Sequence, residues 1–232
     1  QLGNIGWSYD DVLPYFKKSE FKENGNEITR GKGGPLHVSD IVEKHPLCEE
    51  FIRGSSELGI PIQKDYNSGD QEGVFYYQRT IKNGMRFSAY DAFLKTALQR
   101  ENVNVKKHTT VLKIIFENKK AVGLVCKKEN KTFKILANKE IILCAGAIGT
   151  PHLLQVSGIG DAKYLKSIGV EPLFEIKNVG EGLQDHYAVR VANRINIPVS
   201  LNEKARGFRL FLEIIKWFTS KKGLISFSPA HV

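Results

Sequence analysis

The glycines and the threonine of Gly146–Thr150 have residue types and a spacing that suit the binding of an anion. Gly146 and Gly149 permit a tight reversal of the backbone, Thr150 is a preferred type at a helix N-cap, and Pro151 is favoured at the first helical position. A helix that begins here would present bare N–H groups and the positive end of its dipole to a phosphate or an anionic cofactor. Taken alone, the turn fits an ordinary strand-to-helix connection equally well, because the GxGxxG order of nucleotide-binding loops is absent.

Asp185 and His186 are the neighbouring pair that could take part in proton transfer. Adjacent side chains cannot both point at one proton without special backbone geometry, and no nucleophile is spaced to complete a triad with them. We therefore interpret both as structural hydrogen-bonding residues. Because the histidines are isolated singles, we assign none of them a catalytic role. They are His37, His45, His108, His152, His186 and His231.

The three cysteines, Cys48, Cys126 and Cys144, lack the spacing of metal ligands, so we expect no metal site. Cys144 lies inside an apolar run, where the role of a small hydrophobic residue is expected. Their odd number leaves the redox compartment open.

An uninterrupted apolar run, Ile141–Ala145, precedes the glycine turn and predicts the strand that positions it. Because the run lacks the alternation of a half-exposed strand, we expect it to be buried on both faces, as in a parallel α/β sheet. The helix after the turn should extend over His152–Val156 and stop at Ser157 and Gly158.

The remaining elements follow from caps, turns and periodicity. Helices are predicted to begin near Ser8, Pro46, Ser88 and Asp161 and to cover Ala205–Phe218. A turn is expected at Asn83-Gly84, and strands at Leu36–Val38, Val74–Ile81, Val103–Val105, Thr110–Phe116, Ala121–Lys127, Thr132–Leu136 and Val189–Ile197. The four strands between Val103 and Leu136 predict a β-meander inserted before the apolar run.

The net charge of +9 could indicate a nucleic-acid or membrane surface. The lysines, however, are scattered through turns such as Glu117–Lys120 and Lys127–Lys131, without a basic helix or an RNA-binding aromatic motif. We expect a solvated, lysine-rich surface and no nucleic-acid partner, with pairing to acidic segments outside this chain as a further possibility. No apolar stretch reaches transmembrane length, so no membrane span is expected.

The run GAIGTPHLLQVSGIG closely resembles the second signature of the GMC (glucose-methanol-choline) oxidoreductases, a family of FAD-dependent enzymes. Further family-like stretches are WSYDDVLPYFKKSE, GGPLHVSD, GMRFSAYDAFL and NVGEGLQDH, and the run before Leu94 looks most like the insect glucose-dehydrogenase-like branch. The resemblance implies part of an α/β FAD-binding dinucleotide fold with a β-meander insertion, followed by the start of an α+β substrate domain. It places a segment associated with the lid and substrate domain at 1–85, the FAD domain at 86–186 and the start of the substrate domain at 187–232.

By the same resemblance, Val111 would meet the adenine of FAD with its backbone, and Ala145, Gly146 and Thr150 would bind the cofactor. Without the resemblance, Val111 is interpreted as a buried strand valine. The family's catalytic histidine lies near the C-terminus and matches no residue here, and neither does the N-terminal GxGxxG loop. We therefore expect a middle fragment that alone neither retains FAD nor turns over substrate.

The implied reaction moves a hydride from the CH–OH carbon of a small-molecule alcohol or sugar to the flavin N5. Two alternatives stay open: a hydroxynitrile lyase on the same fold, and a catalytically incomplete relative with a binding or structural role. The missing N- and C-terminal segments of the same protein are the expected partners. Secretion is expected from the insect-branch resemblance.

Overall fold

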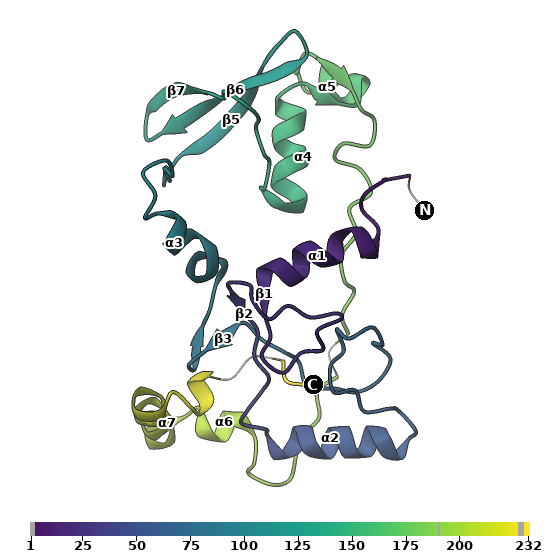
Figure 1. Ribbon diagram of the computed structural model, residues 1–232, viewed down its shortest axis with the longest axis vertical. Helices are drawn as coiled ribbons and strands as arrows, with labels where there is room; N and C mark the ends of the chain where they lie inside the picture. The colour runs from purple at the N-terminus through teal and green to yellow at the C-terminus, as the bar shows by residue number, and fades with distance from the viewer. Residues whose placement is uncertain (1–2, 190, 227–229) are drawn as a thin grey trace. The chain divides into compact units, whose positions relative to one another are not determined.

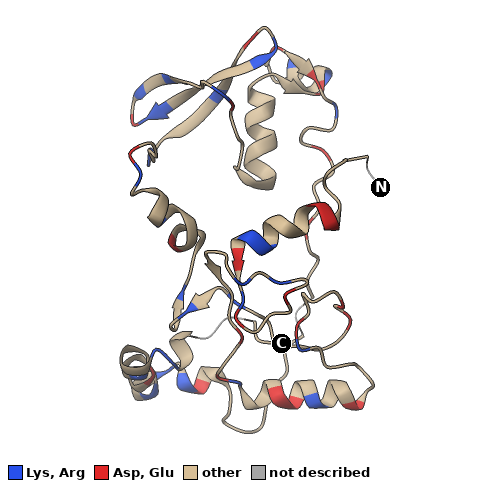
Figure 2. Ribbon diagram, viewed as in Figure 1, with Lys and Arg blue, Asp and Glu red and all other residues tan. Residues whose placement is uncertain are grey.

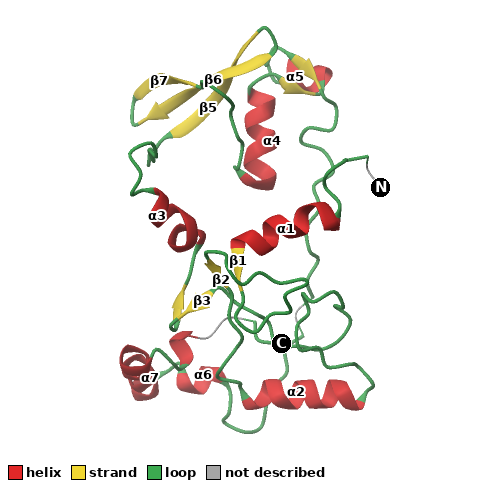
Figure 3. Ribbon diagram, in the orientation of Figure 1, coloured by secondary structure: helices red, strands yellow, loops and turns green. Residues whose placement is uncertain are grey.

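The computed structural model describes residues 3–189, 191–226 and 230–232, and the chain divides into two compact units. Unit 1 comprises Gln1–Asn104 and Ala192–Val232, and unit 2 comprises Val105–Val191. Figure 1 labels their elements, and Figure 3 separates helices from strands. The domain boundaries expected at residues 85 and 186 concern the whole protein and remain a prediction.

Unit 2 is a three-stranded antiparallel sheet against which one helix packs. The sheet has the order β5-β6-β7, α4 contacts β5, and β8 pairs with β9 in parallel. The elements in chain order are β5 (Thr110–Glu117), β6 (Lys120–Lys128), β7 (Lys131–Leu136), α4 (Gly146–Val156), β8 (Ile159–Gly160), α5 (Ala162–Ser167) and β9 (Phe174–Glu175). This mixture of helix and sheet fits a partial α/β domain.

The meander of unit 2 confirms three of the four predicted strands. The β5–β6 hairpin turns at Asn118 and Lys119, both of which have positive φ, as a tight two-residue connection requires. Val103–Val105, the fourth predicted strand, has no strand structure. Its three residues are too few to hold a strand without a pairing partner.

The core of unit 2 lies where β5, β6, α4 and α5 meet. Ile114, Cys126 and Leu165 are nearly or fully buried, and the ring of Phe116 meets that of Phe174 edge-on. Complete burial of a leucine such as Leu165 contributes about 2 kcal/mol. This apolar centre joins the sheet to the segment that follows α4.

The buried strand predicted at Ile141–Ala145 is wrong for this structure. The segment has no strand pairing among the described residues, and Ile142, Cys144 and Ala145 are exposed. A strand is completed by hydrogen bonds to neighbouring strands, and the described residues supply none beside the run. The expectation that Cys144 is a buried small hydrophobe therefore also fails.

Unit 1 consists of short elements joined by long loops. Its pairs β1-β2, parallel, and β3-β4, antiparallel, are two-stranded. The elements are α1 (Tyr9–Ser19), β1 (Glu20–Phe21), β2 (Leu36–His37), α2 (Pro46–Glu57), β3 (Ile81–Lys82), β4 (Met85–Arg86), a π-helical turn (Tyr90–Leu94), α3 (Lys95–Ala97), α6 (Leu201–Lys204), α7 (Gly207–Ser220) and a 3-10 turn (Leu224–Ser226).

Local sequence signals account for most helix starts. Ser8 and Asp11 form a reciprocal capping box at α1, Pro46 opens α2, and the Asp161 side chain accepts from the Tyr164 N–H at α5. Ser88 also makes a reciprocal pair, with Asp91, before the π-helical turn. The predicted helix starts near these caps are confirmed.

Two strand predictions need correction. Val74–Ile81 forms isolated bridges at Val74 and Arg79 rather than a continuous strand, and of its residues Ile81 alone belongs to a strand, β3. Val189–Ile197 shows no strand in its described residues, and residue 190 lies outside them. The helix predicted at Ala205–Phe218 is confirmed as α7, which begins two residues later at Gly207 and ends two residues later at Ser220; the short α6 precedes the predicted range.

Polar side chains form much of the buried part of unit 1. Arg30 is 3% exposed and forms ion pairs with Glu20 and Asp65, while its Nη1 also donates to Gln78. Many large apolar side chains of the chain are exposed instead, including several on α7: Phe208, Phe211, Leu212, Ile215 and Phe218. None of the helices in the described part of the chain is long and apolar enough to cross a bilayer.

Candidate functional site at the start of helix α4

Helix α4 begins at Gly146, earlier than the sequence predicts. Ala145 is the N-cap, and Gly146 has a φ of +81°, which favours glycine. Thr150 is therefore not the N-cap: it lies within the helix, where its Oγ1 accepts from the Ala145 N–H at 3.2 Å. Pro151 follows inside the helix rather than in its first turn.

The first turn of α4 is open to approach. Gly146, Ala147 and Ile148 are exposed, and the first N–H groups of an α-helix have no carbonyl of their own helix to bond. A Cβ added at Gly146 would meet nothing within 4 Å. The backbone here can accept a ligand at close range, with the positive end of the helix dipole beside it.

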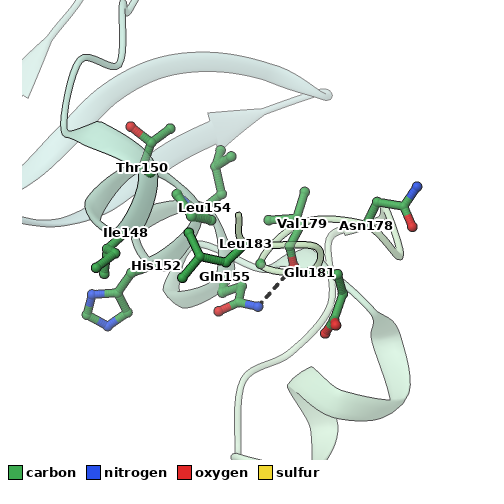
Figure 4. A pocket seen from close by; sticks show the side chains of 12 residues that line it. Ile148, Thr150, His152, Leu154, Gln155, Asn178, Val179, Glu181 and Leu183 are labelled. Atoms are coloured by element: carbon green, nitrogen blue, oxygen red, sulfur yellow. Dashed lines mark hydrogen bonds between the residues drawn. The ribbon is translucent and has the colours of Figure 1, made fainter. Parts of the chain in front are cut away.

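A pocket of about 550 Å³ lies along the same helix, and we call it the α4 pocket. Figure 4 shows its side chains coming from α4 and from the loop at residues 178–183. Its lining residues are Ala147, Ile148, Thr150, Pro151, His152, Leu154, Gln155, Asn178, Val179, Gly180, Glu181 and Leu183. Of the predicted cofactor residues, Thr150 lines the pocket, while Ala145 and Gly146 lie just before it in the chain.

Gln155 joins the two walls of the α4 pocket. Its Nε2 donates to the Val179 carbonyl at 3.0 Å, as the dashed line in Figure 4 marks. Gly180 has a φ of +91°, and a Cβ there would lie 2.3 Å from the Gln155 Nε2. The loop can pass this close to the helix because residue 180 is a glycine.

Gln155 was not predicted from the sequence as a site residue. Its available signal was a polar residue between Leu154 and Val156, in a helix otherwise rich in apolar residues. The partner Val179 lies 24 positions further on and bonds through its backbone. No side-chain pattern at Val179 could have identified that pairing.

The other end of α4 is closed. Ser157 has no exposed surface, and its Oγ accepts from the Ile114 N–H at 2.9 Å and donates to the Leu153 carbonyl at 2.6 Å. This serine satisfies a backbone donor of edge strand β5 and fixes the helix to the sheet.

Val111 lies on β5 opposite Cys126 and is half-buried. A register irregularity follows it, between Val111 and Lys113. The contact of β5 with α4 through Ile114 is at Ser157, the end of the helix opposite Gly146. Val111 thus belongs to the same unit as Gly146, and its predicted role at the adenine remains a prediction.

Charges are sparse at the α4 pocket. Helix α4 carries no Lys, Arg, Asp or Glu, as Figure 2 shows, and Glu181 is the one such residue among the lining residues. Binding of an anion here would therefore depend on backbone N–H groups rather than on a basic side chain.

Asp185 and His186 are fully exposed, and the Asp185 Oδ1 accepts from the His186 N–H. Their structural role stays a prediction.

Comparison with known proteins identifies the family. The family model described as GMC oxidoreductase matches residues 1–188. This chain belongs to the GMC oxidoreductases. The resemblance of the glycine turn and its flanking motifs is thereby confirmed at the level of the family.

Relatives of this GMC oxidoreductase cover nearly all of the chain. Oxygen-dependent choline dehydrogenase from Rhizobium etli is 39% identical over 224 residues, which are 97% of this chain and 41% of that protein. The chain thus spans about two fifths of the relative's length. An expected link to the insect glucose-dehydrogenase-like branch remains a proposal.

Solved structures show the same fold relationship. The FAD-dependent oxidoreductase from Chaetomium thermophilum is 29% identical with a TM-score of 0.84, over 97% of this chain and 42% of that one. Pyridoxine 4-oxidase from Mesorbium loti is 32% identical with a TM-score of 0.71, over 76% of this chain and 35% of that one.

The described residues offer no evident metal centre. Among residues 3–189, 191–226 and 230–232, no three His, Cys, Asp or Glu side chains gather as metal ligands would. The candidate site is a helix N-terminus with a mostly apolar pocket beside it, and this combination suits an organic ligand with an anionic part.

Proposed function

We propose that this chain is part of an FAD-dependent oxidoreductase that acts on the CH–OH group of a small alcohol or sugar. The observation that carries the proposal is the family match over residues 1–188, which includes the helix whose exposed first turn begins at Gly146. The named activities of the relatives, choline dehydrogenase and pyridoxine 4-oxidase, are consistent with oxidation of an alcohol carbon.

The residues at the start of α4 fit one part of FAD. Gly146 leaves the approach to the first-turn N–H groups open, and these donors suit a phosphate oxygen or another anionic edge of the cofactor. The Ala145 N–H donates to the Thr150 hydroxyl and is not free to bond a ligand. Ala145 therefore contributes to the shape of the turn. The apolar lining beside it can keep water from a bound organic group.

When bound, FAD supplies the redox chemistry as the acceptor of a hydride. The residues of this chain orient it: Gln155 keeps the loop at Val179 against α4, and Ser157 keeps α4 against the sheet. We assign no proton acceptor within this chain. The acceptor is proposed to lie in another segment of the whole protein.

The test uses the whole protein, purified with its bound cofactor. We expect FAD at a stoichiometry near one and loss of the oxidised flavin absorbance when an alcohol substrate is added without oxygen. Choline, glucose and pyridoxine are the first substrates to compare. A whole protein without bound flavin would contradict the proposal.

Two alternatives have their own outcomes in that experiment. A hydroxynitrile lyase would retain FAD, cleave a hydroxynitrile and leave the flavin oxidised in the presence of alcohols. A catalytically incomplete relative would show neither reaction. Reduction of the flavin by glucose but not by choline would support the finer proposal of a glucose-dehydrogenase-like enzyme.

The isolated 232-residue chain is expected to behave differently from the whole protein. It offers exposed N–H groups at one helix, without the glycine-rich loop that grips the pyrophosphate in dinucleotide folds. We therefore propose that it retains no FAD, and a purified chain with near-stoichiometric flavin would refute this. Secretion of the whole protein is also proposed, and detection in the culture medium of producing cells would test it.

A further inference from the structure

A second hollow, in unit 1, has basic side chains in its lining, whereas the lining of the α4 pocket contains no Lys or Arg. It encloses about 410 Å³, and Arg79, Lys221 and Lys222 contribute basic side chains to its lining, together with the acids Asp40 and Glu43. The residues come from β2 and its following loop, from the β3–β4 hairpin and from the chain after α7.

Long-range contacts fix the walls of this hollow. The Trp217 Nε1 on α7 donates to the Gly84 carbonyl of the hairpin at 3.0 Å, and a Cβ at Gly84 would lie 2.0 Å from the Lys221 carbonyl oxygen. The Arg79 backbone exchanges hydrogen bonds with Ser39 in both directions. The basic groups are thus attached to backbone that is held in place.

The hydrogen-bonding groups of Arg79 are only partly satisfied by the described residues. Its Nη1 donates to the Ser226 carbonyl at 2.9 Å, whereas its Nε is buried and has no hydrogen-bond partner among the described residues. In the described part of the chain, no carboxylate lies within ion-pair distance of its guanidinium. Burial lowers the pKa of Arg79, and Glu43 opposes this from a distance.

The acidic residues of the lining are already engaged elsewhere. Asp40 pairs with Lys22 at 2.5 Å, and Glu43 pairs with Lys216 at 2.7 Å and also accepts from the Gly223 N–H. Their charges are therefore balanced by groups that do not include Arg79. The lining therefore keeps an excess of positive charge. The Arg79 side chain is half-buried, and its buried Nε has no partner among the described residues, so a bound anion would compensate both the charge and the unpaired donor.

We propose that this hollow binds a small oxyanion, a carboxylate or a phosphate group, with Arg79 as its main contact. The planar guanidinium presents its N–H donors in a fork that matches such oxygens. Lys222 is exposed at the rim and adds attraction that salt will weaken. The proposal is independent of FAD at α4.

The test is a calorimetric titration of the whole protein, with its flavin bound, using inorganic phosphate in one series and acetate in another. Saturable binding at one site is expected with at least one of the two probes. Comparison of the series decides whether the site prefers phosphate or carboxylate, and competition between them shows whether they share it.

Variants assign the binding to this hollow. Arg79→Lys, which keeps the charge and loses the fork, should weaken binding by about tenfold. Lys222→Gln should weaken it by a few fold and reduce its dependence on salt. Lys18→Gln removes an exposed charge from α1, outside the lining, and should leave affinity unchanged.

Two results would overturn the proposal. One is a wild-type protein that shows no saturable binding of either anion. The other is binding that Arg79→Lys and Lys222→Gln leave unchanged. Because Lys222 is exposed, its variant remains informative even if changes at Arg79 impair folding, and an unchanged flavin content serves as the check on folding.

Discussion

The two ends of helix α4 differ in how their polar groups are satisfied. At the C-terminal end, Ser157 is fully buried. Its hydroxyl accepts from the Ile114 N–H of β5 and donates to the Leu153 carbonyl of its own helix. At the N-terminal end, Gly146 is exposed and an added Cβ would meet nothing within 4 Å, and the first N–H groups of a helix have no carbonyl of their own helix to bond. One helix therefore serves the architecture at one end and leaves the other available for a ligand.

This difference predicts that substitutions at the closed end affect stability most. Ser157→Ala should reduce the free energy of unfolding by about 2–3 kcal/mol, because the Ile114 N–H is left buried without an acceptor. Urea denaturation of the whole protein measures it. Ser167→Ala is the matched control, since its hydroxyl also bonds a carbonyl of its own helix but is exposed, and it should cost little. Equal losses of unfolding free energy in the Ser157→Ala and Ser167→Ala variants would contradict the distinction between the closed and open ends of α4.

The contact between α4 and the loop at residues 178–183 should have the second-largest effect on stability. Gly180→Ala is expected to cost about 2 kcal/mol, because alanine is strained at φ +91° and its Cβ would overlap the Gln155 side chain. Adding Gln155→Ala should recover the part due to overlap but not the backbone strain. A double-mutant cycle separates the two, and strict additivity would contradict the contact.

The open end should tolerate change with the smallest effect on folding. Thr150→Val removes the acceptor of the Ala145 N–H but leaves that N–H near solvent, so a loss of about 0.5–1 kcal/mol is expected. Thr150→Ser keeps the hydroxyl and should restore most of it. Thermal unfolding of the two variants side by side makes this comparison. A loss as large as that of Ser157→Ala would show that the start of α4 is structurally closed.

Sequence predicted the parts of this fold whose causes lie within a few residues. The capping box of Ser8 and Asp11, the cap at Asp161 and the three strands of the meander are examples. Each is decided by neighbours in the chain or by a short hairpin turn.

Elements that depend on distant partners were predicted poorly. Ile141–Ala145 has the composition of a central strand, yet the described chain provides no strand beside it. Gln155 bonds a backbone carbonyl in a later loop, and Thr150 fits an N-cap by type although the helix begins four residues earlier.

The most direct test of a ligand-binding start of α4 compares two glycines in the whole protein. Gly146 and Gly169 have similar φ angles, +81° and +77°, and an added Cβ meets nothing within 4 Å at either. Substitution by alanine should therefore cost each about 1–2 kcal/mol of backbone strain. The flavin-to-protein ratio after dialysis should fall in Gly146→Ala and stay at the wild-type level in Gly169→Ala. Equal flavin retention in both variants would contradict the assignment of this helix start to the cofactor.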